Sequence, residues 1–481
     1  NPSSDVAFGG EEMLAQWDPV LDRTVTITAP SDMTPKFGVA GMTLAPVESA
    51  SGGTHTWTFH IANQPDRNPE NGSPSDAAVL PRLVYGIQPS WAKVIEPVAA
   101  KFLATAVPQP LPASIKAEAD RIVAGATTPA DKAKKLFAYV AHDIRSIDLP
   151  LGTAGYQPHA PDAVLAARYA DPRDKVGLLL ALAAAEGISG QPVLVRSGNV
   201  PVLQDVPTLA QFDHIVAKLA VDNKDAWLNP SDEDGQYDVV LAGQDGLVLP
   251  LERGGSELGH RPLADPETSR SHVTAAYALA PNGDLDATYT YQLTGWYARQ
   301  ASSELRPLKG ATLDKFFQEN AADLSAAAVD RGHTVSDTSS VQGPITVTQH
   351  VAVPGYAAAQ GDFRNFELPD ITLSLADDVP TAGLSERKYP LWIGSPRTEQ
   401  GDVTVQIPSG WKVAYVPPKL DGDAAGVHYS SACEAKGQTV SCHDEIRLDK
   451  LEIDPKQYAP YHDALAKLQA YERRVVLLQK G

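Results

Sequence analysis

Positive charge, long apolar stretches and cofactor motifs are all scarce in this sequence. Lysine and arginine number 40 against 59 aspartate and glutamate residues, which gives a formal net charge of −19. Such an acidic chain repels phosphate backbones, so we expect no nucleic acid partner. The longest apolar run, residues 176–185, is too short to cross a bilayer and predicts a buried helix. HExxH, CxxC, GxGxxG and Walker motifs are missing, so we expect neither a metal ion nor a cofactor.

The overall composition is that of a folded protein. Hydrophobic residues make up 43% of the 481 residues and charged residues 21%, which excludes a wholly disordered chain. At about 150 residues per domain, this length suggests three domains. Glycine (36) and proline (39) are frequent, and because both mark turns we expect many short strands and loops.

The two cysteines, Cys433 and Cys442, enclose a predicted hairpin. If the dipeptide Gly-Gln at 437–438 forms a type II′ turn, Lys436 faces Thr439 as the first hydrogen-bonded pair. Counting outward makes the cysteines a non-hydrogen-bonded pair, within disulfide reach. The alternative is a pair of buried thiols without a bond. A disulfide favours an oxidising compartment, so we expect a periplasmic or secreted protein whose signal peptide has been removed before the opening NPSSD.

Residues 1–112 are predicted to form a β-rich N-terminal domain. The stretches 24–28, 54–61 and 80–87 alternate apolar with polar residues, as half-buried strands do. The segment 108–112 (PQPLP) is typical of a linker, because proline blocks both helix and sheet pairing.

Residues 113–250 are predicted to form an α+β domain, with helices first and antiparallel strands after them. Thr128 and Pro129 give an N-cap and a first helical residue to a helix over 131–144. Further helices are expected over 161–170 and 172–186, the latter closed by Gly187. Strands are expected over 191–197, 212–223 and 225–231.

Residues 251–481 are predicted to form a C-terminal β-rich region of one or two subdomains. The turn at 281–283 joins two alternating strands as a hairpin. One helix interrupts the strands over 312–329, and a last helix over 460–471 leads into a closing strand over 473–480.

Part of the middle domain resembles the transglutaminase-like superfamily. It is most similar to the module that, in exported bacterial multidomain proteins, comes after a β-rich domain of unknown function. The matching stretches are AKKLFAYVAHDIRSI, GYQPHAPDAVLAARYADPRDKVGLLLALAAAEGISGQPVLV, FDHIVAKLAV and WLNPS, in that order. The resemblance implies a cysteine-protease-like α+β core. It also implies a cysteine at the start of the buried helix, a histidine on a strand, and an Asp or Asn on the next strand.

The nucleophile of that triad is replaced in this chain. The family pattern Gly-Asp-Cys-Lys-Asp-Lys corresponds to Ala-Asp-Pro-Arg-Asp-Lys at 170–175, so the cysteine position is Pro172. The histidine corresponds to His214 and the acid to Asn229. Proline suits the first position of a helix but has no ionisable group, so it cannot attack a carbonyl.

Several neighbouring residues have two interpretations each. Asp171 and Asp174, with His214, could form an acid/base set for hydrolysis, although acids are common in a first helical turn and His214 could be structural. Arg173 and Lys175 are expected on a solvated face or in ion pairs. Tyr156, His159 and Trp227 could line the former substrate cleft or simply pack.

The sequence therefore predicts a pseudoenzyme, a protein that keeps the cleft of a thiol enzyme without its nucleophile. Its expected role is to bind a peptide, a glycan or an envelope protein. The alternative is a hydrolase of altered chemistry that uses Asp171, Asp174 and His214.

Overall fold

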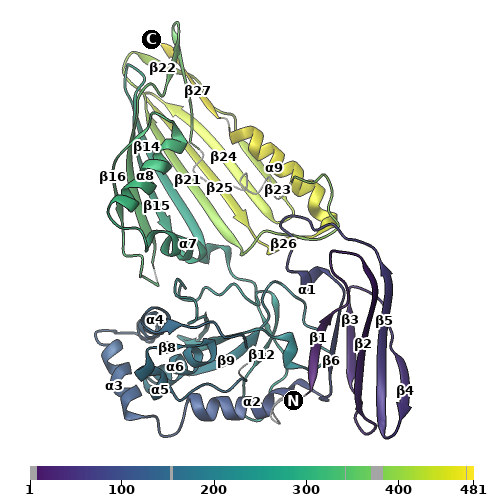
Figure 1. The fold of residues 1–481 in the computed structure, drawn as a ribbon. Helices are drawn as coiled ribbons and strands as arrows, with labels where there is room; N and C mark the ends of the chain where they lie inside the picture. Colours follow the sequence, from purple (N-terminus) through teal and green to yellow (C-terminus); the bar gives the residue numbers. More distant parts are fainter. Residues whose placement is uncertain (1–7, 152–154, 342, 370–382, 473) are drawn as a thin grey trace. The chain divides into compact units, whose positions relative to one another are not determined.

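The structure is a computed structural model that describes residues 8–151, 155–341, 343–369, 383–472 and 474–481. The opening NPSSD, part of the loop before the 161–170 helix, and Arg473 of the closing strand lie outside these residues. The chain divides into two compact units, residues 1–263 and 264–481 (Figure 1). Helices and strands occur in both units, which confirms a multidomain α+β fold. Within the described residues, no helix is long and apolar enough to span a membrane.

The first unit begins with two small antiparallel sheets, as the alternating sequence predicts. One sheet has the order β2-β5-β4 and the other β1-β6-β3. Their strands are β1 (Gly9–Met13), β2 (Val20–Pro30), β3 (Lys36–Ala40), β4 (Val47–Ser51), β5 (Thr54–Gln64) and β6 (Arg82–Gly86). Alternate residues in the second half of β2 and in β5 pack into a shared core that includes Ile27, Trp57 and Phe59.

Two helices of this region were not predicted from the sequence. A short α1 (Asp76–Val79) precedes β6, and a long α2 (Trp91–Ala106) follows it. In α2 the apolar residues recur at helical spacing, from Trp91 through Val94, Ile95 and Val98 to Phe102, and all are buried. Ser90 caps the helix by accepting a hydrogen bond from the Lys93 backbone.

The α+β core of the first unit surrounds one buried helix, α6 (Pro172–Ala185). Helix α6 packs across β9 and β10 on one side and contacts α2 to α5. The sheet has the order β11-β10-β9-β12-β13 and is antiparallel throughout. Its strands are β9 (Gly190–Val195), β10 (His214–Val221), β11 (Lys224–Leu228), β12 (Gly246–Pro250) and β13 (Gly259–Arg261). The sheet thus continues past residue 250, where the sequence suggested a domain boundary.

The helices predicted over 131–144 and 161–170 are present, but the second ends early because Arg168 adopts a left-handed conformation, and residues 169–170 form a strand instead. The helices are α3 (Ala113–Ile122), α4 (Pro129–Ala138) and α5 (Pro161–Ala167), with a π-helical turn η1 (Tyr139–Asp143) extending α4. The Thr128 hydroxyl accepts a hydrogen bond from the Asp131 backbone at 3.1 Å, and Pro129 occupies the first turn, which confirms the predicted cap. Two-residue strands β7 (Arg145–Ser146) and β8 (Tyr169–Ala170) pair in parallel, and a turn η2 (Leu209–Gln211) precedes β10.

The second unit is built on an eight-stranded sheet with the order β16-β17-β15-β14-β21-β25-β24-β23. All neighbours are antiparallel except β14 and β21, which pair in parallel at the middle of the sheet. The strands are β14 (Arg270–Leu279), β15 (Leu285–Leu293), β16 (Val329–Val335), β17 (Ile345–Val353), β21 (Arg397–Gln406), β23 (Leu420–Ala424), β24 (Val427–Lys436) and β25 (Thr439–Leu448).

Helices and shorter strands complete this unit. Helices α7 (Gly295–Leu305) and α8 (Ala311–Leu324) contact the β14 to β17 part of the sheet, and α9 (Tyr458–Glu472) contacts β23 (Figure 1). Only α8 and α9 were predicted. A second sheet has the order β18-β19-β27-β22 and a third pairs β20 with β26. Their strands are β18 (Ala358–Gln360), β19 (Phe363–Glu367), β20 (Leu391–Trp392), β22 (Trp411–Tyr415), β26 (Glu452–Ile453) and β27 (Val475–Lys480); two short turns are η3 (Pro266–Thr268) and η4 (Pro455–Gln457).

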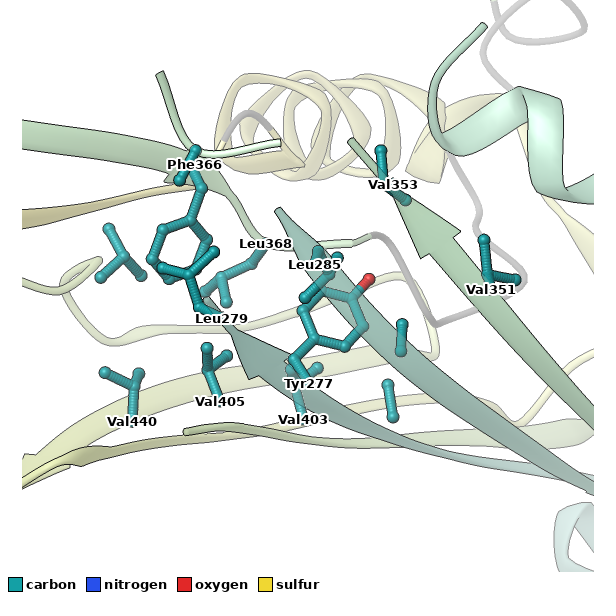
Figure 2. Packing of buried hydrophobic residues seen from close by; sticks show 14 of the residues in the cluster. Tyr277, Leu279, Leu285, Val351, Val353, Phe366, Leu368, Val403, Val405 and Val440 are labelled. Atoms are coloured by element: carbon teal, nitrogen blue, oxygen red, sulfur yellow. The ribbon is translucent and has the colours of Figure 1, made fainter. Parts of the chain in front are cut away.

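The inner face of the eight-stranded sheet carries the main apolar core of this unit. Alternate residues of five neighbouring strands, β17, β15, β14, β21 and β25, point to the same side and meet residues of the smaller sheet, as Figure 2 shows. The labelled members are Tyr277, Leu279, Leu285, Val351, Val353, Phe366, Leu368, Val403, Val405 and Val440. Because strand side chains alternate, the opposite face of these strands is polar.

The predicted cysteine hairpin is confirmed in register and in bonding. Lys436 pairs with Thr439 and Cys433 with Cys442. The two sulfur atoms are bonded, and the cysteine Cα atoms lie 4.1 Å apart. Gly437 has a φ of 61°, the value that the first central residue of a type II′ turn requires.

Candidate functional site

The first turn of α6 is organised by Asp171, which caps the helix. Its carboxylate accepts hydrogen bonds from the backbone N–H groups of Arg173 (2.8 Å) and Asp174 (3.1 Å). Pro172 follows as the first helical residue, where its missing N–H is not needed. The family resemblance predicts that this position corresponds to the nucleophile of the related enzymes, which would lie beside the positive end of the helix dipole.

Asp171 is also the partner of a buried cation. The Arg173 guanidinium forms an ion pair with the Asp171 carboxylate and donates from Nη1 to the Gly155 carbonyl at 2.8 Å. Asp171 is 1% exposed. Burial opposes its ionisation, but hydrogen bonds from Arg173 and from the backbone outweigh this and hold the pKa of the carboxyl below its usual range. Asp171 is therefore ionised and has a structural role. Its bond to Arg173 confirms the prediction that Arg173 takes part in an ion pair.

Asp174, the second predicted acid, is hydrogen-bonded to His159. Its carboxylate accepts from the His159 backbone at 2.7 Å and lies 2.9 Å from the His159 Nδ1 atom. Asp174 is 5% exposed, whereas the His159 side chain is 75% exposed. The two bonds fix the orientation of an imidazole whose ring faces solvent, beside the start of α6.

Lys175 is buried, although the sequence suggested a solvated face or an ion pair. The side chain is 0% exposed, and its Nζ atom donates to the Ala141 carbonyl (3.1 Å) and the Ser146 hydroxyl (2.7 Å). Burial lowers the pKa of the ammonium to about 8, although Glu233 and Asp232 favour the charged form. The position of Lys175 directly before the apolar stretch 176–185 was the sequence feature that could have indicated this burial.

His214 and Asn229 lie side by side at the edge of the core sheet. His214 begins β10, Asn229 follows β11, and the His214 Nε2 and Asn229 Oδ1 atoms are 3.3 Å apart. The same Oδ1 atom accepts from the Ser231 backbone at 3.2 Å, and the Ser231 carbonyl accepts from the Ser146 hydroxyl at 2.9 Å. Because Ser146 also contacts Lys175, one hydrogen-bonded path joins the first turn of α6 to the His214–Asn229 pair.

Ser146 and Glu233 belong to this path and were not singled out in the sequence. The Glu233 carboxylate accepts from the Ser146 backbone at 2.7 Å. Ser146 pairs with Ala170 in the β7–β8 bridge, which places it next to the residue that caps α6. Ser146 lies in the matching stretch 133–147 and Glu233 just after the stretch 227–231, but the sequence gives neither residue a role, so the three-dimensional structure identifies them.

Of the predicted cleft residues, Tyr156 and Trp227 are packing residues in large part. Burial raises the pKa of Tyr156 to about 12. The Trp227 ring packs against the valine cluster of the sheet, and Arg261 and Lys218 lie over it at 5.0 and 5.9 Å from the ring centre. In the parts of the chain that the structure describes, no three His, Cys, Asp or Glu side chains converge as metal ligands.

Comparisons with known proteins find a family match for one stretch of the sequence and a similar fold for nearly the whole chain. Residues 364–478 match a family described as a Domain of Unknown Function with solved-structure structure (DUF3858). No curated protein matches the chain in sequence.

Two solved structures are similar to the chain to very different degrees. A structure described as a putative protease from Parabacteroides distasonis aligns with 98% of this chain and 75% of its own, with a TM-score of 0.67 and 18% identity. A structure described as a putative cysteine protease from Cytophaga hutchinsonii aligns with 47% of this chain and 72% of its own, with a TM-score of 0.23 and 9% identity, too low to support an argument. Nearly the whole chain therefore shares its fold with the Parabacteroides protein.

Proposed function

We propose that this protein is a transglutaminase-like pseudoenzyme that binds a peptide, a glycan or a partner protein in the cell envelope. The observation that carries the proposal is Pro172 at the first position of α6, directly after the Asp171 cap. The helix start that would activate a thiolate is intact, but its residue has no group that could attack a carbonyl.

The surrounding residues support loss of the nucleophile rather than loss of the site. His214 and Asn229 remain within hydrogen-bond range of each other, and an amide can orient an imidazole as an acid does. The path through Ser231, Ser146 and Lys175 connects this pair to the start of α6. A binding module can keep such a framework because recognition does not need a nucleophile.

The alternative, a hydrolase built on Asp171, Asp174 and His214, has mixed support. Asp171 is ionised and engaged with Arg173, which makes it unsuited to donate a proton at neutral pH. Asp174 is bonded to His159 and not to His214. The exposed His159 ring, held by Asp174, is oriented as a general base would be, which favours this alternative.

The disulfide supports an oxidising compartment. A bonded Cys433–Cys442 pair is typical of proteins of oxidising compartments, so we place the protein in the periplasm or outside the cell. Detection of the protein in a periplasmic or secreted fraction, and not in the cytosolic one, checks this placement.

Restoring the thiol tests the proposal. Both native cysteines are bonded, so any iodoacetamide label on Pro172→Cys reports on that position alone. We expect Pro172→Cys to react at neutral pH about ten-fold faster than Pro129→Cys, which places a cysteine at the start of α4 without the histidine. Adding His214→Ala to Pro172→Cys should remove the difference. Equal rates for the two single variants would contradict a preserved site geometry.

The wild-type protein should also be inactive. We expect no hydrolysis of fluorescent casein and no incorporation of an amine probe into casein by the full chain. Hydrolysis that His159→Ala abolishes would overturn the pseudoenzyme proposal and establish the hydrolase instead. Hydrolysis that survives His159→Ala but is lost in His214→Ala would overturn it as well.

A further inference from the structure

A groove in the second unit lies between helices α7 and α8 and the eight-stranded sheet. Its volume is about 600 Å³, a size that suits a small ligand or a few residues of a peptide. Strands β15 and β17 form the floor, and the two helices form the walls. We call it the α7–α8 groove; it is independent of the site at the start of α6.

The floor and inner walls of the α7–α8 groove are apolar. Its lining includes the partly buried side chains of Tyr291, Leu293, Phe316 and Leu324. Val347 also lines it and is buried. The one buried amide of the floor is satisfied internally, because Gln349 donates to the Phe317 carbonyl at 2.7 Å. The groove therefore offers an apolar, partly aromatic surface to a ligand rather than buried polar groups.

The rim of the α7–α8 groove is negatively charged. Glu304 and Asp323 line it and are exposed, together with the amides of Gln300 and Asn320. None of the residues found to line the groove is lysine, arginine or histidine. A cation near this rim would meet two carboxylates and no competing positive charge in the lining.

The two helices add to this negative potential. Glu304 lies in the last turn of α7 and Asp323 in the last turn of α8, and neither turn contains a basic residue. The carboxyl end of a helix carries the negative end of its dipole, where a cation is stabilising and an acid is not. Arg306 follows α7 but does not line the groove. Residues of both last turns line the groove, so both helix ends add negative potential to it.

We propose that the α7–α8 groove binds an apolar peptide segment that carries a lysine or arginine. Its apolar side chains would contact Phe316 and the strand residues, and its cation would lie at the rim formed by Glu304 and Asp323. A neutral sugar gains nothing from the net charge of the rim, and an anionic lipid or phosphate is repelled by it. The proposal stands independently of the proposed function of the α6 site.

Fluorescence anisotropy with two matched peptides tests this proposal on the full chain. The probes are labelled, end-blocked peptides of sequence Leu-Lys-Phe-Leu and Leu-Glu-Phe-Leu. We expect the lysine probe to bind at least about ten-fold more tightly at low salt and the preference to weaken as salt screens the rim. The double variant Glu304→Gln/Asp323→Asn should remove the preference, and Phe316→Ala should weaken both probes.

The matched control is Glu319→Gln on the same helix. Glu319 is paired with Lys315 at 3.3 Å and does not line the groove, so its loss should leave both affinities unchanged. Equal affinity for the two probes, no binding of either, or an effect of Glu319→Gln as large as that of the double variant would each overturn the proposal. Preferential binding of chitotriose over the lysine probe would replace the peptide with a glycan.

Discussion

The first turn of α6 and the α7–α8 groove use charge in opposite ways. At the start of α6, Asp171, Arg173 and Lys175 are almost wholly buried and bonded to neighbouring groups. At the groove, Glu304 and Asp323 are exposed on an apolar surface. Charges of the first kind hold a structure together, because removing one leaves its partner buried and uncompensated. Charges of the second kind are inexpensive to change and are suited to recognition.

The sharpest test of this contrast is Asp171→Ala. It removes the cap of α6 and leaves the Arg173 guanidinium without its carboxylate, so we expect a loss of about 3–5 kcal/mol of unfolding free energy. Asp171→Asn should cost less, because an amide still caps a helix. Urea unfolding of both variants measures the difference. A loss of less than about 1 kcal/mol for Asp171→Ala would contradict the claim that the buried charges at the start of α6 stabilise the structure.

The disulfide of the second unit provides a second stability measurement, because its expected role is purely structural. Replacing both Cys433 and Cys442 by serine opens a loop with a sequence separation of 9, which should cost about 2–3 kcal/mol. Wild-type protein unfolded under reducing conditions should reproduce the loss. The neighbouring change Ser441→Ala is the control and should be close to neutral. A disulfide variant as stable as the wild type would show that sheet pairing alone holds the hairpin.

The buried Lys175 ammonium predicts that the stability of the protein depends on pH. Its pKa is lowered to about 8 from 10.5, so between these values the unfolded chain binds more protons and stability rises with pH. The unfolding free energy of wild type, relative to that of Lys175→Met, should therefore increase by about 1–2 kcal/mol when the pH is raised from about 8 to 9.5. A difference that stays constant over this range would show that the ammonium is not buried in solution.

The smallest effect is expected at the groove rim. Glu304→Gln and Asp323→Asn should each change the unfolding free energy by less than about 0.5 kcal/mol, because both side chains are exposed. Thermal unfolding of each variant beside Lys315→Met, an exposed change outside the groove, measures this. A loss above about 1 kcal/mol would mean that the rim is structural after all.

The sequence predicted local structure best where one physical rule decides it. The 433–442 register follows from the turn type and the strict alternation of strand pairing, and it is confirmed residue by residue. The start of α6 follows from a proline at the first helical position, and the structure adds that Asp171 is the cap. Helix α2 was missed although Ser90 caps it and its apolar residues recur at helical spacing, because Pro97 inside it argues against a helix. Helix α7 has no side-chain cap to mark its start.

The site was predicted less completely than the fold. The pairing of His214 with Asn229 came from the family resemblance, whereas the Asp174–His159 contact and the burial of Lys175 depend on how distant segments pack. Ser146 is the clearest omission, since it lies in the matching stretch 133–147 but nothing there distinguishes it from its neighbours. The α7–α8 groove was also invisible, because its lining comes from two helices and two strands that no single motif joins.

The parallel pairing of β14 with β21 has a practical consequence for dissecting this chain. The stretch that matches a known family, residues 364–478, contains β21 but not β14, its partner from residue 270 onward. A fragment cut at the family boundaries would present a long unprotected strand edge, the kind of surface on which proteins aggregate. The smallest expressible piece of this half of the molecule is therefore set by backbone pairing and begins before β14.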